Sequence, residues 1–139
     1  MSNFVIDSSV AIKWLFREKG SRPAEALLQE FTSFWAPELF LIEMDAVISK
    51  KVRKRELPAT KAPGKSKQVK KLPCTIVSHQ KIAPLAFDIA ISLSVTFYDA
   101  TYLAVAIEKN GVLYTADQRL VNGLSNTMLK QYVKSIWQK

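Results

Sequence analysis

The stretch SVTFYDATYLAVAIEKNGVLYTADQRL, residues 94–120, combines a helical pattern with a strand pattern. We predict a helix from Asp99 to Asn110 that Gly111 ends, because glycine is the usual residue just beyond a helix. The apolar run VLYTA then predicts a strand. One acid, Asp99, stands where the helix begins, and another, Asp117, follows the strand. Acids therefore border both apolar elements.

The same alternation of apolar strands and helical stretches runs through the whole chain. Strands are predicted at NFVI (3–6), SFWA (33–36), CTIV (74–77), VLYTA (112–116) and QYVKSIW (131–137). Helical stretches separate them, among them residues 8–16, 23–31, 37–56 and 80–93. Apolar strands that alternate with helices form parallel sheets covered by helices on both faces. We therefore expect an α/β fold with about five parallel strands, in one domain spanning residues 1–139.

Composition narrows the class of protein. The 139 residues are 48% apolar, and no apolar run reaches the ~20 residues that a membrane helix needs. One cysteine, Cys74, excludes an internal disulfide, and with the single histidine, His79, it cannot complete a zinc site. The first residues lack the features of a signal peptide. We expect a cytoplasmic protein without a membrane partner.

Positive charge is concentrated in residues 50–71, the basic segment. This segment holds ten Lys or Arg and one acid, a net of +9, so the other 117 residues sum to −1 within a total of +8. Clustered cations displace counterions from phosphates, which favours a nucleic-acid surface. A solvated helix pair without a ligand and a surface for an acidic protein are the alternatives. The candidate phosphate-binding residues are Lys50, Lys51, Arg53, Lys54 and Arg55.

Asp7 and Asp117 each follow a predicted strand and precede a predicted helix. In open parallel sheets, ligands bind outside the carboxyl ends of the strands, where both acids would lie. The alternative is that each acid caps its helix by accepting a backbone N–H. Asp99 has the same alternative, since it begins a helix and also borders that helix's apolar face.

Glu43 lies within the predicted long helix, among Leu39, Ile42, Ala46 and Val47. At about 100° per residue, these neighbours surround Glu43, so we expect its side chain to point along the core-facing side. An ionised carboxylate there costs several kcal/mol unless a cation or hydrogen bonds compensate. No basic residue in the sequence presents itself as the partner.

Four carboxylates that converge on one edge of a sheet would repel one another. Mg²⁺ or Mn²⁺ removes this conflict, because these hard cations take oxygen ligands and bind through carboxylates together with substrate phosphates. The acids and the basic segment together predict metal-dependent hydrolysis of phosphodiester bonds.

Three stretches and their spacing resemble the PIN-domain ribonucleases, in particular the VapC-type toxins: FVIDSSVAIKWL, APELFLIEMDAV and FYDATYLAVAIEKNGVLYTADQRL. The resemblance covers nearly the whole chain. It implies a three-layer α/β/α sandwich and an endoribonuclease that cuts RNA with Mg²⁺ or Mn²⁺. It also implies a homodimer and a cognate antitoxin.

The resemblance carries over to individual residues. Asp7, Glu43, Asp99 and Asp117 match the four catalytic and metal-binding acids. Ser9 and Thr115 match hydroxyl residues that orient ligands or water. The family usually has asparagine three residues after the helix acid, where this chain has Ala46.

Three further apolar residues of the long helix, Leu41, Met44 and Ile48, lie away from Glu43 and predict a subunit or antitoxin interface. The alternative function is a PIN-like RNA-binding or scaffolding module with impaired catalysis, which Ala46 favours. A phosphorylation-receiver domain is excluded, because the third strand, CTIV, is not followed by a phospho-acceptor Asp.

Overall fold

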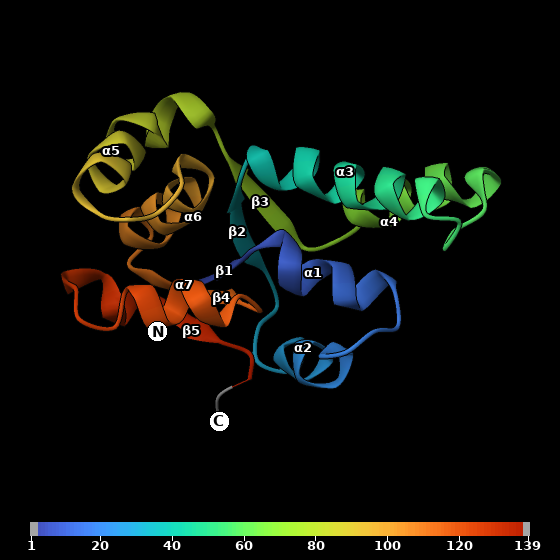
Figure 1. The fold of residues 1–139 in the computed structure, drawn as a ribbon, viewed down its shortest axis with the longest axis horizontal. Helices are drawn as coiled ribbons and strands as arrows, with labels where there is room; N and C mark the ends of the chain where they lie inside the picture. The colour runs from blue at the N-terminus through green and yellow to red at the C-terminus, as the bar shows by residue number, and fades with distance from the viewer. Residues whose placement is uncertain (1–2, 138–139) are drawn as a thin grey trace.

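The computed structural model describes residues 3–137, which form a five-stranded parallel sheet between helices (Figure 1). The strands are β1 (Asn3–Ile6), β2 (Phe34–Pro37), β3 (Cys74–Val77), β4 (Gly111–Thr115) and β5 (Val133–Ser135). Their order across the sheet is β3-β2-β1-β4-β5, and every pair is parallel. The predicted α/β fold with parallel strands is confirmed.

The strand order creates a switch point in the centre of the sheet. From β1 the chain proceeds through β2 to β3 on one side, and it then returns to place β4 and β5 on the other side. β1 and β4 are therefore neighbours, with Ile6 opposite Tyr114. The carboxyl ends of strands at such a switch point border the crevice in which α/β proteins bind ligands.

Helices cover both faces of the sheet (Figure 1). α1 (Ser8–Leu15) and α2 (Ser21–Leu27) lie on one face, and α5 (His79–Ser92) and α6 (Phe97–Glu108) lie on the other. α7 (Gln118–Gly123) and a 3-10 turn (Met128–Tyr132) lead into β5. The segment Ala100–Ala106 of α6 is buried on all sides, because it lies between the sheet and α5.

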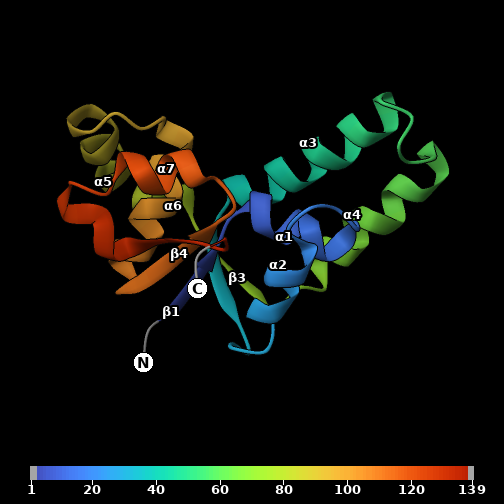
Figure 2. The same ribbon diagram turned by 60° about the horizontal axis from the view of Figure 1, so that its bottom comes forward.

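α3 (Leu39–Arg53) and α4 (Ala62–Lys70) form a helix pair that projects from the body of the protein (Figure 2). A 3-10 turn, Ala59–Lys61, connects them. We call residues 50–71 of this pair the arm; it is the basic segment in its folded form. Lys51 pairs with Glu18 at 3.5 Å, and the Lys51 and Lys65 ammonium groups lie 4.8 and 4.7 Å from the ring centre of Phe16. These contacts attach the arm to the end of α1.

The buried side of α3 differs from the prediction. Met44 and Ile48 were predicted to form an interface, but they are 0% and 3% exposed and belong to the core with Phe40. The reason is that only a narrow i, i+4, i+8 stripe of α3 reaches the body before the helix projects away from it. Of the predicted interface residues, only Leu41 is exposed.

The ends of α6 also differ from the prediction. The helix begins at Phe97, and the capping side chain is that of Thr96, which accepts the Asp99 N–H at 3.1 Å. At the other end, Asn110 has the left-handed conformation that ends the helix, with φ +51°. Gly111 instead begins β4, where a Cβ atom would collide with the backbone oxygen of Asn3.

Among residues 3–137, no helix combines the length and the apolar character needed to cross a lipid bilayer.

Candidate functional site

Asp7 lies at the carboxyl end of β1 and is only 8% exposed. Its Oδ1 accepts hydrogen bonds from the Ser9 hydroxyl at 2.6 Å and from the Val10 N–H at 3.2 Å, so the predicted cap of α1 is present. Burial, with a smaller contribution from the charge of Glu43, raises the pKa of Asp7 to about 6, although hydrogen bonds from Ser9, Thr115 and Val10 lower it. Asp7 is thus a helix cap whose carboxylate is costly to ionise.

Ser9 and Thr115 connect the loop after β1 to the loop after β4. The Ser9 hydroxyl accepts the Ala116 N–H at 2.9 Å, and the Thr115 hydroxyl accepts the Asp117 N–H at 3.0 Å. The two hydroxyl oxygens lie 3.4 Å apart. The two hydroxyls therefore hold both acid-bearing loops in place.

Asp117 caps α7 at the end of β4. Its Oδ1 accepts the N–H groups of Arg119 and Leu120 at 3.0 and 3.4 Å. The peptide group between Ala116 and Asp117 is held by a residue near the end of the chain, since the Trp137 indole N–H donates to the Ala116 carbonyl at 2.8 Å. Nothing in the local sequence signals this contact, which depends on β5 lying beside β4.

Glu43 accepts two hydrogen bonds on one oxygen. Its Oε1 receives the Tyr102 hydroxyl at 2.6 Å and the Ser8 hydroxyl at 3.1 Å. Burial, together with the charge and hydrogen bond of Glu43, raises the pKa of Tyr102, so the phenol stays protonated and remains a donor. We did not predict either donor, although Tyr102 lies one helical turn after Asp99 and its spacing was a usable signal.

The predicted surroundings of Glu43 were partly wrong. Ile42 is 66% exposed and Ala46 is also exposed, whereas Leu39 and Val47 are half-buried. Glu43 is itself half-buried and lies beside the core-facing stripe, because α3 is turned so that Phe40, Met44 and Ile48 face inward. The compensation that its burial requires comes from hydroxyl donors.

Asp99 is the least constrained of the four acids. Thr96 caps α6 by accepting the Asp99 N–H, and within the described part of the chain the Thr96 hydroxyl is the one hydrogen-bonding group that lowers the pKa of Asp99. Burial raises the pKa of Asp99, and the charges of Asp117 and Glu43 raise it further. Asp99 and Asp117 line a common cleft of about 250 Å³, together with Thr96 and Arg119.

The electrostatic couplings link all four acids in one series, from Asp7 through Glu43 and Asp99 to Asp117. Each acid has at least one carboxylate oxygen that accepts no hydrogen bond from residues 3–137. These oxygens are accessible to solvent. None of the four forms an ion pair in this part of the chain. We call these residues the acidic cluster.

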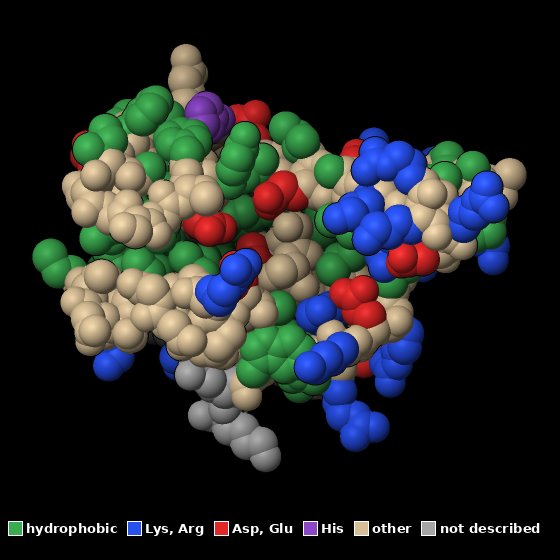
Figure 3. All heavy atoms as spheres, in the orientation of Figure 1, with side chains coloured by type: hydrophobic (Ala, Val, Ile, Leu, Met, Phe, Trp, Pro, Cys, Tyr) green, Lys and Arg blue, Asp and Glu red, His purple; other side chains and the backbone are tan. Residues whose placement is uncertain are grey.

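The acidic cluster is not drawn together around one point. Within the described residues, no three Asp, Glu, His or Cys side chains are arranged to enclose a metal ion. The donor set nevertheless fits a hard divalent cation, because it offers several solvent-accessible carboxylate oxygens. Figure 3 shows acidic side chains near the middle of one face and Lys and Arg gathered over the arm.

The residues proposed for phosphate binding on the arm fall into two groups. Lys50, Arg53, Lys54 and Arg55 are exposed. The Lys51 side chain is only 18% exposed and pairs with Glu18 and Glu56, each at 3.5 Å. The charge of Lys51 is therefore partly neutralised within the protein.

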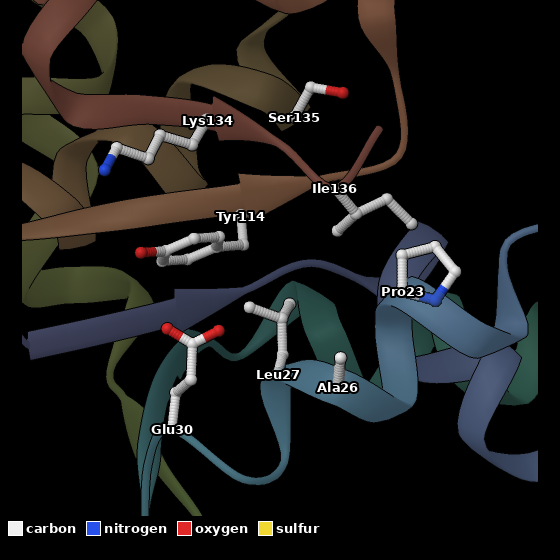
Figure 4. Close-up of a pocket in the computed structure, with 8 residues that line it drawn as sticks. All are labelled: Pro23, Ala26, Leu27, Glu30, Tyr114, Lys134, Ser135 and Ile136. Atoms are coloured by element: carbon white, nitrogen blue, oxygen red, sulfur yellow. The ribbon is translucent and has the colours of Figure 1, made fainter. Parts of the chain in front are cut away.

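A larger cavity, of about 500 Å³, lies away from the acidic cluster. It opens between α2 and the strands β4 and β5, and none of the four acids lines it (Figure 4). Figure 4 shows Tyr114 and Glu30 on facing walls, with Lys134 at one end. Side chains of neighbouring strand residues point to opposite faces, so Tyr114 and Thr115 separate this cavity from the acidic cluster.

Solved structures with the same fold support the architecture. The structure of PAE2754 from Pyrobaculum aerophilum is 17% identical, with a TM-score of 0.72 over 98% of this chain and 92% of that one. A toxin–antitoxin complex from Klebsiella pneumoniae is 16% identical, with a TM-score of 0.63 over 99% and 100% of the two chains. VapC20 from Mycobacterium tuberculosis, described as a sarcin-ricin loop cleaving toxin, is 15% identical, with a TM-score of 0.65 over 83% and 90%. At these identities the likeness shows the fold alone.

A comparison with curated protein sequences finds no significant match. A comparison with protein-family models finds one that spans most of the chain, described as "PIN domain" and matching residues 4–122. This range includes all four residues of the acidic cluster and the whole arm. The chain belongs to the PIN domain family.

Proposed function

We propose that this chain is a divalent-metal-dependent endoribonuclease that hydrolyses phosphodiester bonds in RNA, and that it acts as the toxin of a toxin–antitoxin pair. The observation that carries the proposal is the acidic cluster: four coupled carboxylates with accessible oxygens, without a cationic partner among residues 3–137, at the switch point of the sheet. Membership in a family whose members are generally nucleases supports it.

Asp7, Glu43, Asp99 and Asp117 would hold Mg²⁺ or Mn²⁺ in this protein. When bound, the ion supplies positive charge that activates water and offsets the negative charge of the phosphate group. Hydroxyl donors keep the acids in position for it: Ser9 holds Asp7, and Tyr102 and Ser8 hold Glu43. Such outer-shell donors orient the ligands of a metal site.

Exposed apolar side chains support the proposed protein partners. They are Leu41 and Ile42 on α3, Phe87 and Ile91 on α5, and Tyr98 in the first turn of α6. Apolar residues gathered on exposed helices favour contacts with another protein. We propose a cognate antitoxin and a second copy of the chain as these partners. The RNA substrate, the contacts of the arm with it and a cytoplasmic location belong to the same proposal.

A second candidate function is a PIN-like module that binds RNA or serves as a scaffold with impaired catalysis. The observation that favours it is Ala46, three residues after Glu43, at a position where PIN-domain ribonucleases usually have asparagine. Ala46 is exposed and offers no side-chain hydrogen bond near the acidic cluster. Glu43 has two hydroxyl donors of its own, which favours the catalytic proposal.

The test of the function is a cleavage assay on total RNA with Mg²⁺ or Mn²⁺. We expect Asp7→Asn to abolish cleavage, because asparagine keeps the shape but loses the charge that holds a cation, and RNA binding to persist. The matched control is Asp88→Asn, which changes an exposed acid on α5 and should leave activity intact. EDTA should stop the wild-type reaction and added metal should restore it. Equal cleavage by wild type and Asp7→Asn would identify a contaminant, and binding without cleavage by either protein would favour the module.

A further inference from the structure

Arg119 is the one cation that lines the cleft of Asp99 and Asp117 among the described residues. It follows Asp117 by two residues, in the first turn of α7, and its side chain is exposed. Within residues 3–137 its guanidinium group makes no ion pair, although two carboxylates share the cleft with it. Sequence reasoning assigned Arg119 no function.

Two other exposed cations that lie near an acid do form an ion pair with it. Arg17 contacts Glu25 at 2.7 Å, and Lys81 contacts Glu108 at 3.0 Å. Arg119 therefore differs from them: it lies beside acids and leaves its charge available. Among the causes that set the pKa of Asp99, burial and the charges of Asp117 and Glu43 all raise it, and no cation lowers it. Arg119 thus shares the cleft with both acids.

The hydrogen bond of Arg119 to Asp117 is made by its main chain and not by its side chain. Its backbone N–H donates to Asp117 Oδ1 at 3.0 Å, which helps to hold that acid. The guanidinium group takes no part in this bond. A substitution of the side chain therefore leaves the support of Asp117 in place, so that any effect on RNA reports the guanidinium group itself.

We propose that Arg119 binds a phosphate group of the RNA strand at the rim of the acidic cluster and so positions the strand for cleavage. A guanidinium group offers a planar fork of donors that matches phosphate oxygens. Phosphate contacts orient a nucleic acid without reading its bases, so the effect of Arg119 should not depend on RNA sequence. This inference rests on the proposed nuclease function for its catalytic part, but not for its binding part.

The experiment compares Arg119→Gln with Lys130→Gln, which removes the same charge from an exposed residue of the 3-10 turn outside this cleft. Binding of a labelled single-stranded RNA of mixed sequence is measured at several salt concentrations, with Asp7→Asn added to every protein so that the RNA stays intact. We expect Arg119→Gln to lower the slope of log affinity against log salt by about 0.7, the value for one phosphate contact on a single strand. Lys130→Gln should leave the slope unchanged.

Cleavage is measured in parallel with Asp7 present. We expect Arg119→Gln to lower kcat/KM at least tenfold, Lys130→Gln to have little effect, and Arg119→Lys to restore part of the loss because it restores the charge. Equal slopes and equal kcat/KM for the two Gln variants would overturn the proposal. If the wild type cleaves no RNA, the nuclease function fails, and the salt slopes alone still decide whether Arg119 contacts a phosphate.

Discussion

The acidic cluster and the arm carry opposite charges and are built in opposite ways. The acids come from four separate segments: the end of β1, the middle of α3, the start of α6 and the loop after β4. The cations of the arm are close neighbours in the sequence, on one helix and the helix that returns beside it. The acids are half-buried or buried, whereas most of the arm's cations are exposed.

This difference in burial predicts how strongly a single substitution affects activity or stability. Burial raises the pKa of Asp7 and Asp99, so each of these acids is held at a cost that the fold must offset. An exposed cation costs little and contributes at most about 1 kcal/mol, which salt further screens. We therefore expect large effects from single changes in the acidic cluster and small, cumulative effects from changes in the arm.

The largest effect is expected from Glu43→Gln. It removes a charge that two hydroxyl groups hold in position, and we expect cleavage to fall at least ~100-fold, beyond the roughly 10–100-fold typical of outer-shell residues. Asp45→Asn on the same helix is the control, since Asp45 is exposed and, among residues 3–137, its carboxylate accepts a hydrogen bond only from Ser66 of α4. Initial rates on the same RNA measure both. Similar rates for the two variants would remove Glu43 from the site.

An intermediate effect is expected on stability in EDTA, where Asp7 remains without a cation. The unfolded state ionises Asp7 near its ordinary pKa of 3.8, and the folded state does so near 6. Between these values the unfolded state holds fewer protons, so the free energy of unfolding falls as the pH rises, and the loss is complete above about pH 6. Between pH 4 and 7, the free energy of unfolding of the wild type should fall by on the order of 1–3 kcal/mol more than that of Asp7→Asn.

Urea unfolding of both proteins at several pH values measures this difference. A difference that stays constant from pH 4 to 7 would mean that the pKa of Asp7 is not raised in the folded protein.

The smallest effects per residue are expected in the arm. Replacing Lys50, Arg53, Lys54 and Arg55 together by Ala should lower the salt slope of RNA binding by up to about 3, while each single change should be hard to detect. Lys51→Ala serves as the contrast, because its ion pairs with Glu18 and Glu56 predict a loss of stability of up to about 1 kcal/mol. An unchanged slope in the fourfold variant would assign these charges to solubility or to an acidic protein partner.

Much of the fold could be predicted from local patterns. Strands β1 and β3 begin and end where predicted, and Asp7 and Asp117 do cap their helices. The errors concern which side of a helix faces the core and where a helix begins: Met44 and Ile48 face the core, and the capping residue of α6 is Thr96. Periodicity shows which residues share a face of a helix, but it does not show how far that helix extends beyond the sheet.

The sequence by itself determined the elements, the concentration of cations in residues 50–71 and the identity of the four acids as exceptions to apolar patterns. Only the tertiary structure decided which groups surround those acids. Tyr102 reaches Glu43 across 59 residues, Ala116 reaches Ser9 across 107, and Trp137 supports the loop of Asp117 from the end of the chain. Such contacts depend on the strand order at the switch point, because β1 and β4 become neighbours only after the sheet has formed. Arg119 is the clearest case, since a surface arginine becomes a candidate ligand for phosphate only where the fold sets it in one cleft with two acids and, within residues 3–137, without an ion pair.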